Sequence, residues 1–359
     1  MTAVTVTHAL GFYPVHVRAG VLARAPEIVR DAVGHRHTVT ITDVTVAPLL
    51  KGWRLGPLAE APLTVPAGEA AKTREHWAAL TDRLVERGLG RDGAIVAIGG
   101  GSVGDLAGFV AATYLRGVPI VQIPTTLLAM VDASVGGKVA VDLPLGKNLV
   151  GAFHPPVAVI ADPDVLGSLP ERDLIGGLAE AVKHGLVADA GYFDWIVSNA
   201  GAIKARDPAA IQHLVRRSVE IKAAIVGADE REAGERMILN AGHTVAHALE
   251  RVSAYSLPHG QAVALGLIAE AALAERLGTA AGLVGPITTA LTTLGLPVRA
   301  PAGLDATAVV AAMDTDKKNR GSEIRFSLLE AIGRAHRSGQ RWTISASPNR
   351  IMEALSSVL

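Results

Sequence analysis

The strongest constraint on the fold is the alternation of short, apolar, β-branched runs with helix-like stretches through the first half of the chain. The runs Thr38–Ile41, Ala94–Ile98 and Ile120–Ile123 have the length and composition of buried strands. The stretches Arg74–Gly88 and Leu106–Tyr114 between them have helical spacing. This alternation predicts a layered α/β domain on a largely parallel sheet. Further strands are expected at Val15–Arg18, Leu63–Val65 and Val157–Ala161.

The pattern changes after about Pro163, where long Ala-, Leu- and Ile-rich segments with helical spacing begin. They predict a mostly α-helical second domain, so we expect an α/β N-terminal domain at residues 1–166 and a mainly helical C-terminal domain at 167–359. Helices are expected at Glu171–Ala188, Pro208–Ala228, Ile238–Val252, Gly260–Leu277 and Val284–Leu294, with short late strands at Arg325–Leu328 and Arg341–Ile344.

Composition excludes several classes of protein. The 359 residues include 34 basic and 34 acidic side chains, and this balance gives no overall field for binding nucleic acid or an anionic membrane. The chain has no cysteine, so a metal would have to bind His, Asp or Glu. Neither a signal peptide at Met1–Val4 nor an apolar run of about 18 residues is evident, so we expect a cytoplasmic protein.

A glycine-rich segment, Gly99–Asp105, follows a predicted strand and precedes a predicted helix. Glycines let a backbone approach a pyrophosphate, and a helix N-terminus supplies free N–H groups. Gly99, Gly101 and Gly104 fit G-x-G-x-x-G, although a tight turn would need the same glycines. Since no acid follows about 20 residues later to bind a ribose, we expect an upstream acid such as Asp43 to do so.

Four polar residues recur at spacings of four, three and four: Arg236, Asn240, His243 and His247. On one continuous helix this spacing places all four side chains on one face. A single helical histidine is usually structural, but four stacked polar groups favour a functional site. By spacing alone, His243 and His247 would be the natural zinc pair.

Three further groups are ambiguous on local grounds. Glu180 and Lys183 share a helix face, where a surface ion pair is the simpler interpretation. His259 begins an apolar helix and could belong only to its cap. The segments Val131–Lys138 and Gly146–Asn148 place lysines beside glycines, which suits phosphate or carboxylate binding in a loop and suits a solvated turn equally well. Together the motifs suit an anionic, hydroxyl-bearing substrate oxidised or reduced beside a metal.

In order and spacing these motifs resemble the 3-dehydroquinate synthase family of the sugar-phosphate cyclases, from about Pro66 to Arg320. The resemblance is carried by Gly99–Asp105, Arg116–Gly117, Pro124–Thr126, Val131–Lys138, Gly146–Asn148, Gly177–Lys183, Asn240–His247 and His259–Gly260. It implies a dehydroquinate synthase-like fold, with a dinucleotide-binding domain at 1–166 and a metal- and substrate-binding domain at 167–359.

The resemblance also implies two cofactors, NAD and zinc, with cobalt as the alternative metal. The implied metal ligands, which overrule the choice of His247 by spacing, are Glu180, His243 and His259. The implied NAD contacts are Asp43, Glu69, Lys72, Gly100, Gly101, Ser102, Val103, Gly104, Asp105, Thr125, Thr126, Lys138, Lys147, Val165 and Ser168. The implied substrate contacts are Asp132, Lys138, Asn148, Lys183, Lys222, Arg236, Asn240 and His247, with Lys317 or Lys318.

The implied activity is the shikimate-pathway conversion of 3-deoxy-D-arabino-heptulosonate 7-phosphate to 3-dehydroquinate and phosphate. NAD is reduced and reoxidised within one cycle, phosphate is eliminated between the two hydride transfers, and an aldol closure forms the ring. The resemblance implies that Arg236 and Lys222 bind the substrate carboxylate. It implies phosphate contacts for Lys138, Asn148 and Arg116, and hydroxyl contacts for Lys183 and Asn240. Either His247 or the substrate phosphate moves the proton. Arg116 resembles a residue that enters a neighbouring subunit's site, which implies a homodimer.

Three alternatives remain to be weighed. A secondary-metabolic cyclase acting on another heptulose phosphate would alter the anion-binding residues, and Lys222 and Arg236 are both present here. A metal-dependent polyol dehydrogenase binds uncharged substrates, which would leave Lys138 and Lys183 without a purpose. A catalytically silent nucleotide-binding regulator predicts eroded metal or lysine positions, and none is eroded.

Overall fold

Residues 3–314 and 323–359 are described by a computed structural model, in which the chain divides into two compact units. The sheet unit comprises residues 1–170 and 211–230, and the helical unit comprises residues 171–210 and 231–359. The helix α7 (Pro208–Ala228) starts in the helical unit and contributes its residues from Ile211 onward to the sheet unit. The domain boundary between residues 166 and 167 stays a prediction.

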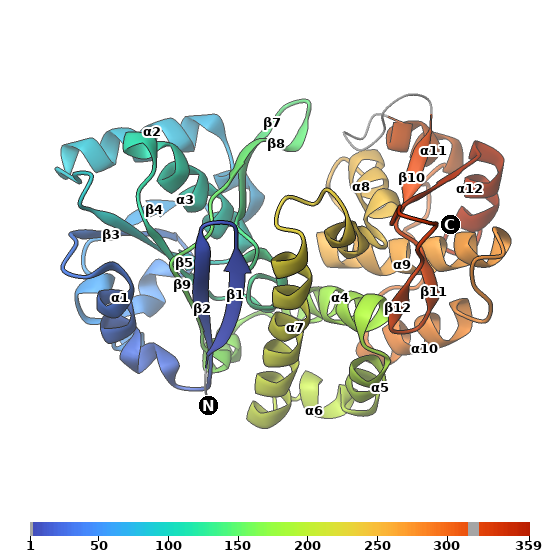
Figure 1. Ribbon diagram of the computed structural model, residues 1–359, viewed down its shortest axis with the longest axis horizontal. Helices are drawn as coiled ribbons and strands as arrows, with labels where there is room; N and C mark the ends of the chain where they lie inside the picture. Colours follow the sequence, from blue (N-terminus) through green and yellow to red (C-terminus); the bar gives the residue numbers. More distant parts are fainter. Residues whose placement is uncertain (1–2, 315–322) are drawn as a thin grey trace. The chain divides into compact units, whose positions relative to one another are not determined.

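The sheet unit is built on a seven-stranded sheet in which every pairing except β1–β2 is parallel (Figure 1). The strand order is β1 (Val4–His8), β2 (Gly11–Val17), β9 (Ala158–Ala161), β6 (Ile120–Pro124), β5 (Ala94–Gly99), β3 (Thr38–Asp43) and β4 (Leu63–Val65). The chain passes from β3 outward to β4 and then returns to the other side of β3 as β5, so the strand order reverses between β3 and β5. In open α/β sheets, such a reversal leaves a crevice for ligands at the carboxyl ends of the strands.

Helices α2 (Arg74–Glu86) and α3 (Gly101–Thr113) share a buried apolar core with the central strands. Every residue of β5 is buried, which explains its continuous apolar sequence AIVAIG, because a central parallel strand is covered on both faces. Helix α1 (Ala25–Val33) contacts β9. The parallel α/β architecture expected from the sequence is confirmed. The sheet unit also contains short 3-10 helices, η1 (Val21–Arg24), η2 (Ala47–Trp53), η3 (Gly56–Ala59), η4 (Gly68–Ala71), η5 (Tyr114–Arg116) and η7 (Pro163–Ser168), and the short π-helix η6 (Ala129–Ala133).

The segments expected to form a lysine-bearing loop are only partly a loop. Residues 131–137 form the end of η6 and a turn, whereas Lys138, Lys147 and Asn148 lie in a β-hairpin that the sequence did not predict. Strand β7 (Lys138–Leu143) pairs antiparallel with β8 (Gly146–Phe153). Its buried residues Val139 and Val141 belong to the core shared with α3, and this tertiary contact orders a segment that its glycines and lysines made look like a turn.

The helical unit is centred on α9 (His259–Arg276), which is buried almost throughout and contacts α4, α8, α10 and α12 (Figure 1). Its Ala- and Gly-rich sequence lets neighbouring helices approach closely. The other helices are α4 (Glu171–Ala188), α5 (Ala190–Ser198), α6 (Ala200–Lys204), α8 (His243–Val252), α10 (Val284–Leu294), α11 (Ala306–Asp314) and α12 (Pro348–Leu355). The predicted mainly helical character of this region is confirmed.

The single helix expected at Ile238–Val252 is wrong. The chain forms a short 3-10 helix, η8 (Glu235–Asn240), then breaks, and α8 starts at His243. The break is at Gly242, whose φ of +80° is left-handed and suits glycine. Arg236 and Asn240 therefore do not share a helix with His243 and His247, and the expected single face does not exist.

Within residues 323–359, the last part of the chain that the structure describes, short strands form at β10 (Ile324–Phe326), β11 (Leu329–Ala331), β12 (Arg334–Ala335) and β13 (Ile344–Ala346). Strand β10, which pairs with β13, overlaps the strand expected at Arg325–Leu328, whereas β13 shares only Ile344 with the strand expected at Arg341–Ile344. Across residues 3–314 and 323–359, no helix combines the length and apolar character needed to cross a membrane.

Candidate active site

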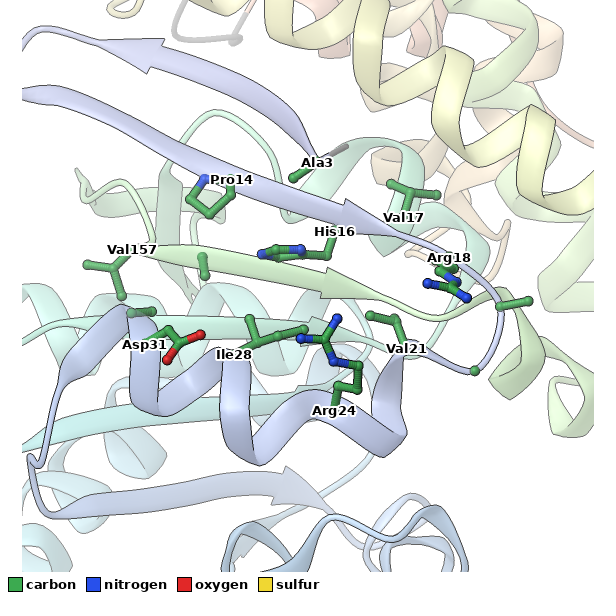
Figure 2. Close-up of a pocket in the computed structure, with 14 residues that line it drawn as sticks. Ala3, Pro14, His16, Val17, Arg18, Val21, Arg24, Ile28, Asp31 and Val157 are labelled. Carbon is green, nitrogen blue, oxygen red and sulfur yellow. The ribbon is translucent and has the colours of Figure 1, made fainter. Parts of the chain in front are cut away.

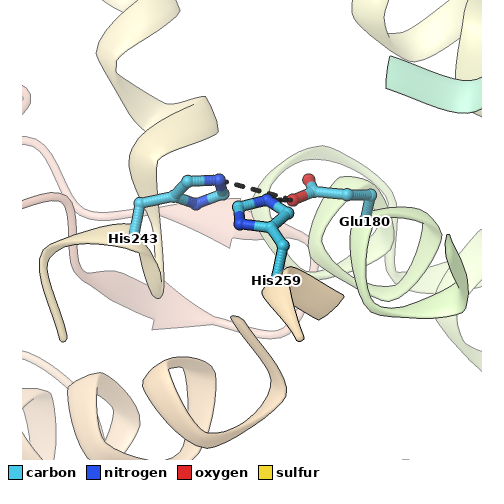
Figure 3. Close-up of side chains that lie close together, drawn as sticks. All are labelled: Glu180, His243 and His259. Carbon is cyan, nitrogen blue, oxygen red and sulfur yellow. Dashed lines mark ion pairs between the residues drawn. The ribbon is translucent and has the colours of Figure 1, made fainter. Parts of the chain in front are cut away.

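Three side chains with metal-binding atoms converge in the helical unit (Figure 3). Glu180 comes from the middle of α4, His243 is the first residue of α8, and His259 is the first residue of α9. One ligand atom from each lies within 4.8 Å of the others. We call these three residues the histidine cluster.

Close helix packing brings the histidine cluster together, and two glycines of α9 make that packing sterically feasible. A Cβ on Gly260 would lie 2.0 Å from the carbonyl oxygen of Gly176 in α4. A Cβ on Gly266 would lie 1.9 Å from the carbonyl oxygen of Gly242, directly before α8. Both approaches are far below van der Waals contact, so only glycine fits at these two positions.

The distances within the histidine cluster suit a small metal ion. The Nε2 atoms of His243 and His259 lie 3.3 Å and 3.5 Å from Oε1 of Glu180. With metal–ligand bonds of about 2.1 Å, neighbouring ligand atoms of a tetrahedral zinc site are about 3.4 Å apart. Glu180 is fully buried, and the groups that face its carboxylate oxygens are the Lys183 ammonium and the two imidazoles. A buried carboxylate of this kind suits coordination by a cation.

The charges around the histidine cluster favour ligand forms at two of its members. Burial alone would raise the pKa of Glu180, but the charge of Lys183 and the proximity of His243 hold it well below its usual range. Burial and the charge of Lys183 lower the pKa of His243 to about 4. Burial also opposes the charged form of His259. The effect of Glu180 and Glu250 is larger than that of burial, and it raises the pKa of His259 to about 10. A metal would therefore compete with a proton at His259.

Two neighbours support the histidine cluster. Lys183, one turn after Glu180 on α4, forms an ion pair with Glu180 Oε2, and both side chains are buried. The simpler interpretation of this pair, a solvated surface contact, is therefore wrong. Glu250 is also buried, and its Oε1 lies 3.5 Å from Nδ1 of His259. A carboxylate behind a ligating histidine fixes the orientation and tautomer of the ring.

The remaining substrate contacts expected in the helical unit are Arg236, Asn240 and His247. Arg236 is 2% exposed on η8. Asn240 donates from Nδ2 to Oε1 of Glu232 at 2.5 Å. The rings of His247 and His243 meet edge to face at a centroid distance of 5.5 Å, yet His247 is not part of the converging trio. Lys317 and Lys318 lie outside the described residues.

A second polar group, which we call the lysine cluster, lies in the sheet unit and consists of Lys72, Asp105, Asn148, Asp142 and Glu69. The Lys72 ammonium, 4% exposed, donates to Asp105 Oδ2 at 2.8 Å and to Asn148 Oδ1 at 2.5 Å, and it lies 3.8 Å and 3.5 Å from Asp142 and Glu69. Burial opposes its charge, but Asp105, Glu69 and Asp142 outweigh burial and raise the pKa of Lys72.

Asn148, a residue of β8 with a strained backbone, belongs to the lysine cluster. Asn148 has a φ of +53°, which is unusual for a non-glycine residue, and its N–H donates to Asp142 Oδ1 at 2.7 Å. Burial and a hydrogen bond with Glu69 raise the pKa of Asp142 to about 6. Lys147, the preceding residue, lies 3.8 Å from Glu69. Five residues expected at either NAD or substrate, Glu69, Lys72, Asp105, Lys147 and Asn148, are therefore neighbours.

The glycine segment lies where the strand order reverses. Strand β5 ends at Gly99, Gly100 precedes α3, and Gly101–Asp105 form the first turns of α3, so the expected strand–glycine–helix arrangement is confirmed. Thr125 follows β6 and donates its N–H to Gly99 O at 2.9 Å. Asp43 ends β3 beside β5, but its Oδ1 already accepts the N–H groups of Thr45 and Val46.

Other expected site residues of the sheet unit are spread over several elements. Lys222 on α7 donates to both the carbonyl and Oδ1 of Asp132, each at 2.7 Å. Lys138 is exposed at the start of β7. Arg116 is exposed on η5 with a φ of +70°, and its role in a neighbouring subunit stays a prediction. Ser102 donates to Glu69 at 3.4 Å, Thr126 accepts the Ala129 N–H, and Val165 and Ser168 lie in η7.

Sequence reasoning missed four acids that contact expected site residues or the neighbours of such residues in the chain: Asp142, Glu232, Glu250 and Glu270. Glu250 follows His243 by seven residues on α8, so helical spacing could have indicated it. Asp142, Glu232 and Glu270 make their contacts through chain reversals or between helices, for which the sequence carries no local signal.

A separate cavity of about 520 Å³ lies between β2, α1 and the start of β9 (Figure 2). His16, Arg18, Arg24 and Asp31 are among the residues that line it, and burial and the charge of Arg24 lower the pKa of His16. None of the residues expected at the metal, NAD or substrate lines this cavity. It is therefore not the candidate site.

Comparison with known proteins shows which family this chain resembles. The family description "3-dehydroquinate synthase N-terminal" matches residues 62–176, and "3-dehydroquinate synthase C-terminal" matches residues 177–319. A curated relative, 3-dehydroquinate synthase of Xanthomonas campestris pv. campestris (strain 8004), is 45% identical over 337 residues, which cover 90% of this chain and 91% of the relative.

Two solved structures share the whole architecture. One is 2-deoxy-scyllo-inosose synthase with carbaglucose-6-phosphate, NAD⁺ and Co²⁺, with a TM-score of 0.89, 25% identity and full coverage of both chains. The other is 2-epi-5-epi-valiolone synthase from Streptomyces hygroscopicus subsp. jinggangensis 5008 with NAD⁺ and Zn²⁺, with a TM-score of 0.85, 29% identity and 96% coverage of both chains. With both family descriptions matched in sequence order and close curated relatives along most of its length, the chain belongs to the 3-dehydroquinate synthase family.

Proposed function

We propose that this chain converts 3-deoxy-D-arabino-heptulosonate 7-phosphate to 3-dehydroquinate and phosphate, with NAD and a divalent metal as cofactors. Family membership supports the reaction. The observation that carries the metal dependence is the convergence of Glu180, His243 and His259 at distances that suit a tetrahedral ion. When bound, NAD supplies reversible hydride transfer and the metal polarises substrate hydroxyl oxygens.

The histidine cluster would hold the metal, with zinc as our first choice and cobalt as the alternative. One carboxylate and two imidazoles form a donor set that zinc commonly uses, and three protein ligands leave a coordination position for substrate. Lys183 beside Glu180 is suited to orient a substrate hydroxyl, since its ammonium is buried and held in place by the ion pair.

NAD would bind at the carboxyl ends of β3 and β5, where the strand order reverses. The N-terminus of α3 offers unpaired N–H groups and a positive dipole end to a pyrophosphate, and Asp43 at the end of β3 offers a carboxylate to a ribose. The second oxygen of Asp43 would have to serve, because Oδ1 accepts two backbone N–H groups. Lys72 and Asp105, which pair with each other at 2.8 Å, would be among the residues that contact NAD.

Cationic and amide groups would bind the two anionic ends of the substrate. Arg236 and Lys222 suit the carboxylate, and Lys138 and Asn148 suit the phosphate, because Arg, Lys and amide N–H groups are strong donors to such oxygens. We infer further that Arg116 completes the phosphate contacts of a neighbouring subunit in a homodimer. Proton removal before phosphate elimination falls to His247 or to the substrate phosphate itself.

The direct test measures phosphate release from 3-deoxy-D-arabino-heptulosonate 7-phosphate with NAD and Zn²⁺ present, and with each withheld. We expect release that requires both, without accumulation of NADH, because the hydride returns within each cycle. Accumulating NADH would indicate a polyol dehydrogenase instead. Release from sedoheptulose 7-phosphate, but not from the first substrate, would indicate a secondary-metabolic cyclase and would contradict the proposal.

A further inference from the structure

The first turn of α8 is capped by a side chain that belongs to α9. The first N–H groups of a helix have no partner within it, and Gly242, which precedes α8, has no side chain with which to cap them. Glu270 takes that place: Oε2 accepts the Gly242 N–H at 2.7 Å, and Oε1 accepts those of Thr244 and Val245 at 3.1 Å and 3.3 Å.

The carboxylate that forms this cap is buried. Glu270 is 3% exposed, and a buried carboxylate is unfavourable unless hydrogen bonds and opposite charge compensate it. Three N–H donors and the positive end of the α8 dipole contribute to that compensation. One turn earlier on α9, Gly266 lies against the carbonyl of Gly242, where a Cβ would approach to 1.9 Å. The cap and this contact together fix the start of α8 against α9.

The capped turn begins with a member of the histidine cluster. His243 is the first residue of α8, between Gly242 and Thr244, whose N–H groups Glu270 binds. His259 is the first residue of α9, the helix that carries Glu270. Any displacement of the first turn of α8 from α9 would therefore change the separation of the two imidazoles.

We propose that Glu270 is a positioning residue for the metal site: its cap on α8 holds His243 so that the Nε2 atoms of His243 and His259 converge on Glu180. This inference rests on the proposed function, since it assumes that the histidine cluster binds a metal. Groups that orient metal ligands from behind typically change metal affinity by about 10- to 100-fold when they are removed.

The same helix offers a matched control. Glu275, also on α9, caps α10 in the same manner, because its Oε1 accepts the N–H groups of Leu283 and Val284 at 2.6 Å and 3.1 Å. Helix α10 carries none of the expected site residues. A cap that matters only for stability should behave alike at the two positions, whereas a positioning role should appear at Glu270 alone.

The experiment compares Glu270→Gln and Glu275→Gln with the parent chain. Two quantities are measured: the Zn²⁺ dissociation constant, by competition with a chromogenic chelator, and the visible absorption of the Co²⁺-loaded protein. We expect both variants to lower the melting temperature of the metal-free protein. Only Glu270→Gln should weaken Zn²⁺ binding, by about 10- to 100-fold, and shift the Co²⁺ bands. Parental Zn²⁺ affinity and an unchanged Co²⁺ spectrum in Glu270→Gln would overturn the proposal.

Two further measurements keep the test decisive. If Glu270→Gln does not fold, Glu270→Asp replaces it: the charge remains, but the shorter side chain cannot reach all three donors. Weaker Zn²⁺ binding then supports the proposal, and parental binding overturns it. The parent and His243→Ala separate this inference from the proposed function. If the parent binds no Zn²⁺, or if His243→Ala binds it equally well, the metal site itself is refuted together with the role of Glu270.

Discussion

The histidine cluster and the lysine cluster are each built around one buried charged side chain, Glu180 in the first and Lys72 in the second, but they are completed in different ways. In the lysine cluster, a chain cation, Lys72, satisfies Asp105 and Asn148 at hydrogen-bonding distance. In the histidine cluster, two imidazole nitrogens face one carboxylate oxygen at separations that suit a metal. The lysine cluster stabilises the fold without a ligand, whereas the histidine cluster has the donor set of a metal site. Loss of a residue should therefore lower the stability of the protein in the lysine cluster and weaken metal binding in the histidine cluster.

The largest effect that this contrast predicts is loss of activity in His243→Ala. The imidazole is held neutral by burial and by Lys183, so its removal leaves no uncompensated charge and should change the unfolding free energy of the metal-free protein by only about 1 kcal/mol. Metal polarisation is worth several kcal/mol, so phosphate release should fall by about 1000-fold or more. Metal content, phosphate release and thermal unfolding are the measurements.

His35→Ala is the matched control for this variant, because His35 is exposed in the sheet unit and belongs to no predicted site. It should match the parent in all three measurements. Retained metal and activity in His243→Ala would remove the distinction between the two clusters.

The opposite result is expected for Lys72→Met, which keeps the length of the side chain and removes its charge. Asp105, Asp142 and Glu69 would lose their common cation. Breaking a fully buried ion pair costs about 3–5 kcal/mol, and we reduce this to roughly 2–3 kcal/mol because these carboxylates are partly exposed. Urea unfolding should report that loss, while Zn²⁺ affinity should remain at the parental value.

Two variants sharpen this result. Lys51→Met removes an exposed lysine and should leave urea unfolding unchanged. Adding Asp105→Asn to Lys72→Met should recover part of the lost stability, because one uncompensated carboxylate disappears. If Lys72→Met unfolds like the parent, the lysine cluster does not stabilise the sheet unit.

The two clusters also differ in how far the sequence could predict them. Helices with sustained Ala and Leu periodicity, such as Glu171–Ala188 and Val284–Leu294, were predicted at their observed bounds, because local pattern decides them. The helix expected across Gly242 failed because the break depends on the contact of Gly242 with Gly266, a residue of another helix. The β7–β8 hairpin was missed for a similar reason, since its order comes from packing on α3.

The site residues follow the same division. Spacing on one helix suggested His243 and His247, and it carried no information about His259, which begins a different helix. Only the resemblance to a family indicated Glu180, His243 and His259 together. The acids that hold site residues in place, Asp142 and Glu270, make contacts set by chain reversal and helix packing, and single-sequence patterns do not encode such contacts.

The smallest predicted effect concerns the pH dependence of Asp142. Its pKa in the folded chain is about 6, against an ordinary aspartate value of 3.8 in the unfolded chain, so the folded state binds the proton more tightly. Stability from this group is therefore greatest below about pH 4 and falls as pH rises through the window from 4 to 6. The loss should amount to about 1 kcal/mol, because Asp142 is partly exposed and solvent screens its charge.

Asp142→Asn should remove this dependence while keeping an oxygen that accepts the Asn148 N–H. Relative to the parent, the variant should become more stable as pH rises from 4 to 7, and urea unfolding at several pH values measures the difference. The control is Asp82→Asn, because Asp82 is an exposed residue of α2, and this variant should show no such trend. A constant difference between Asp142→Asn and the parent would mean that Asp142 is ionised throughout this range. The lysine cluster would then be a plain ion-pair network, and its contrast with the histidine cluster would rest on Lys72 alone.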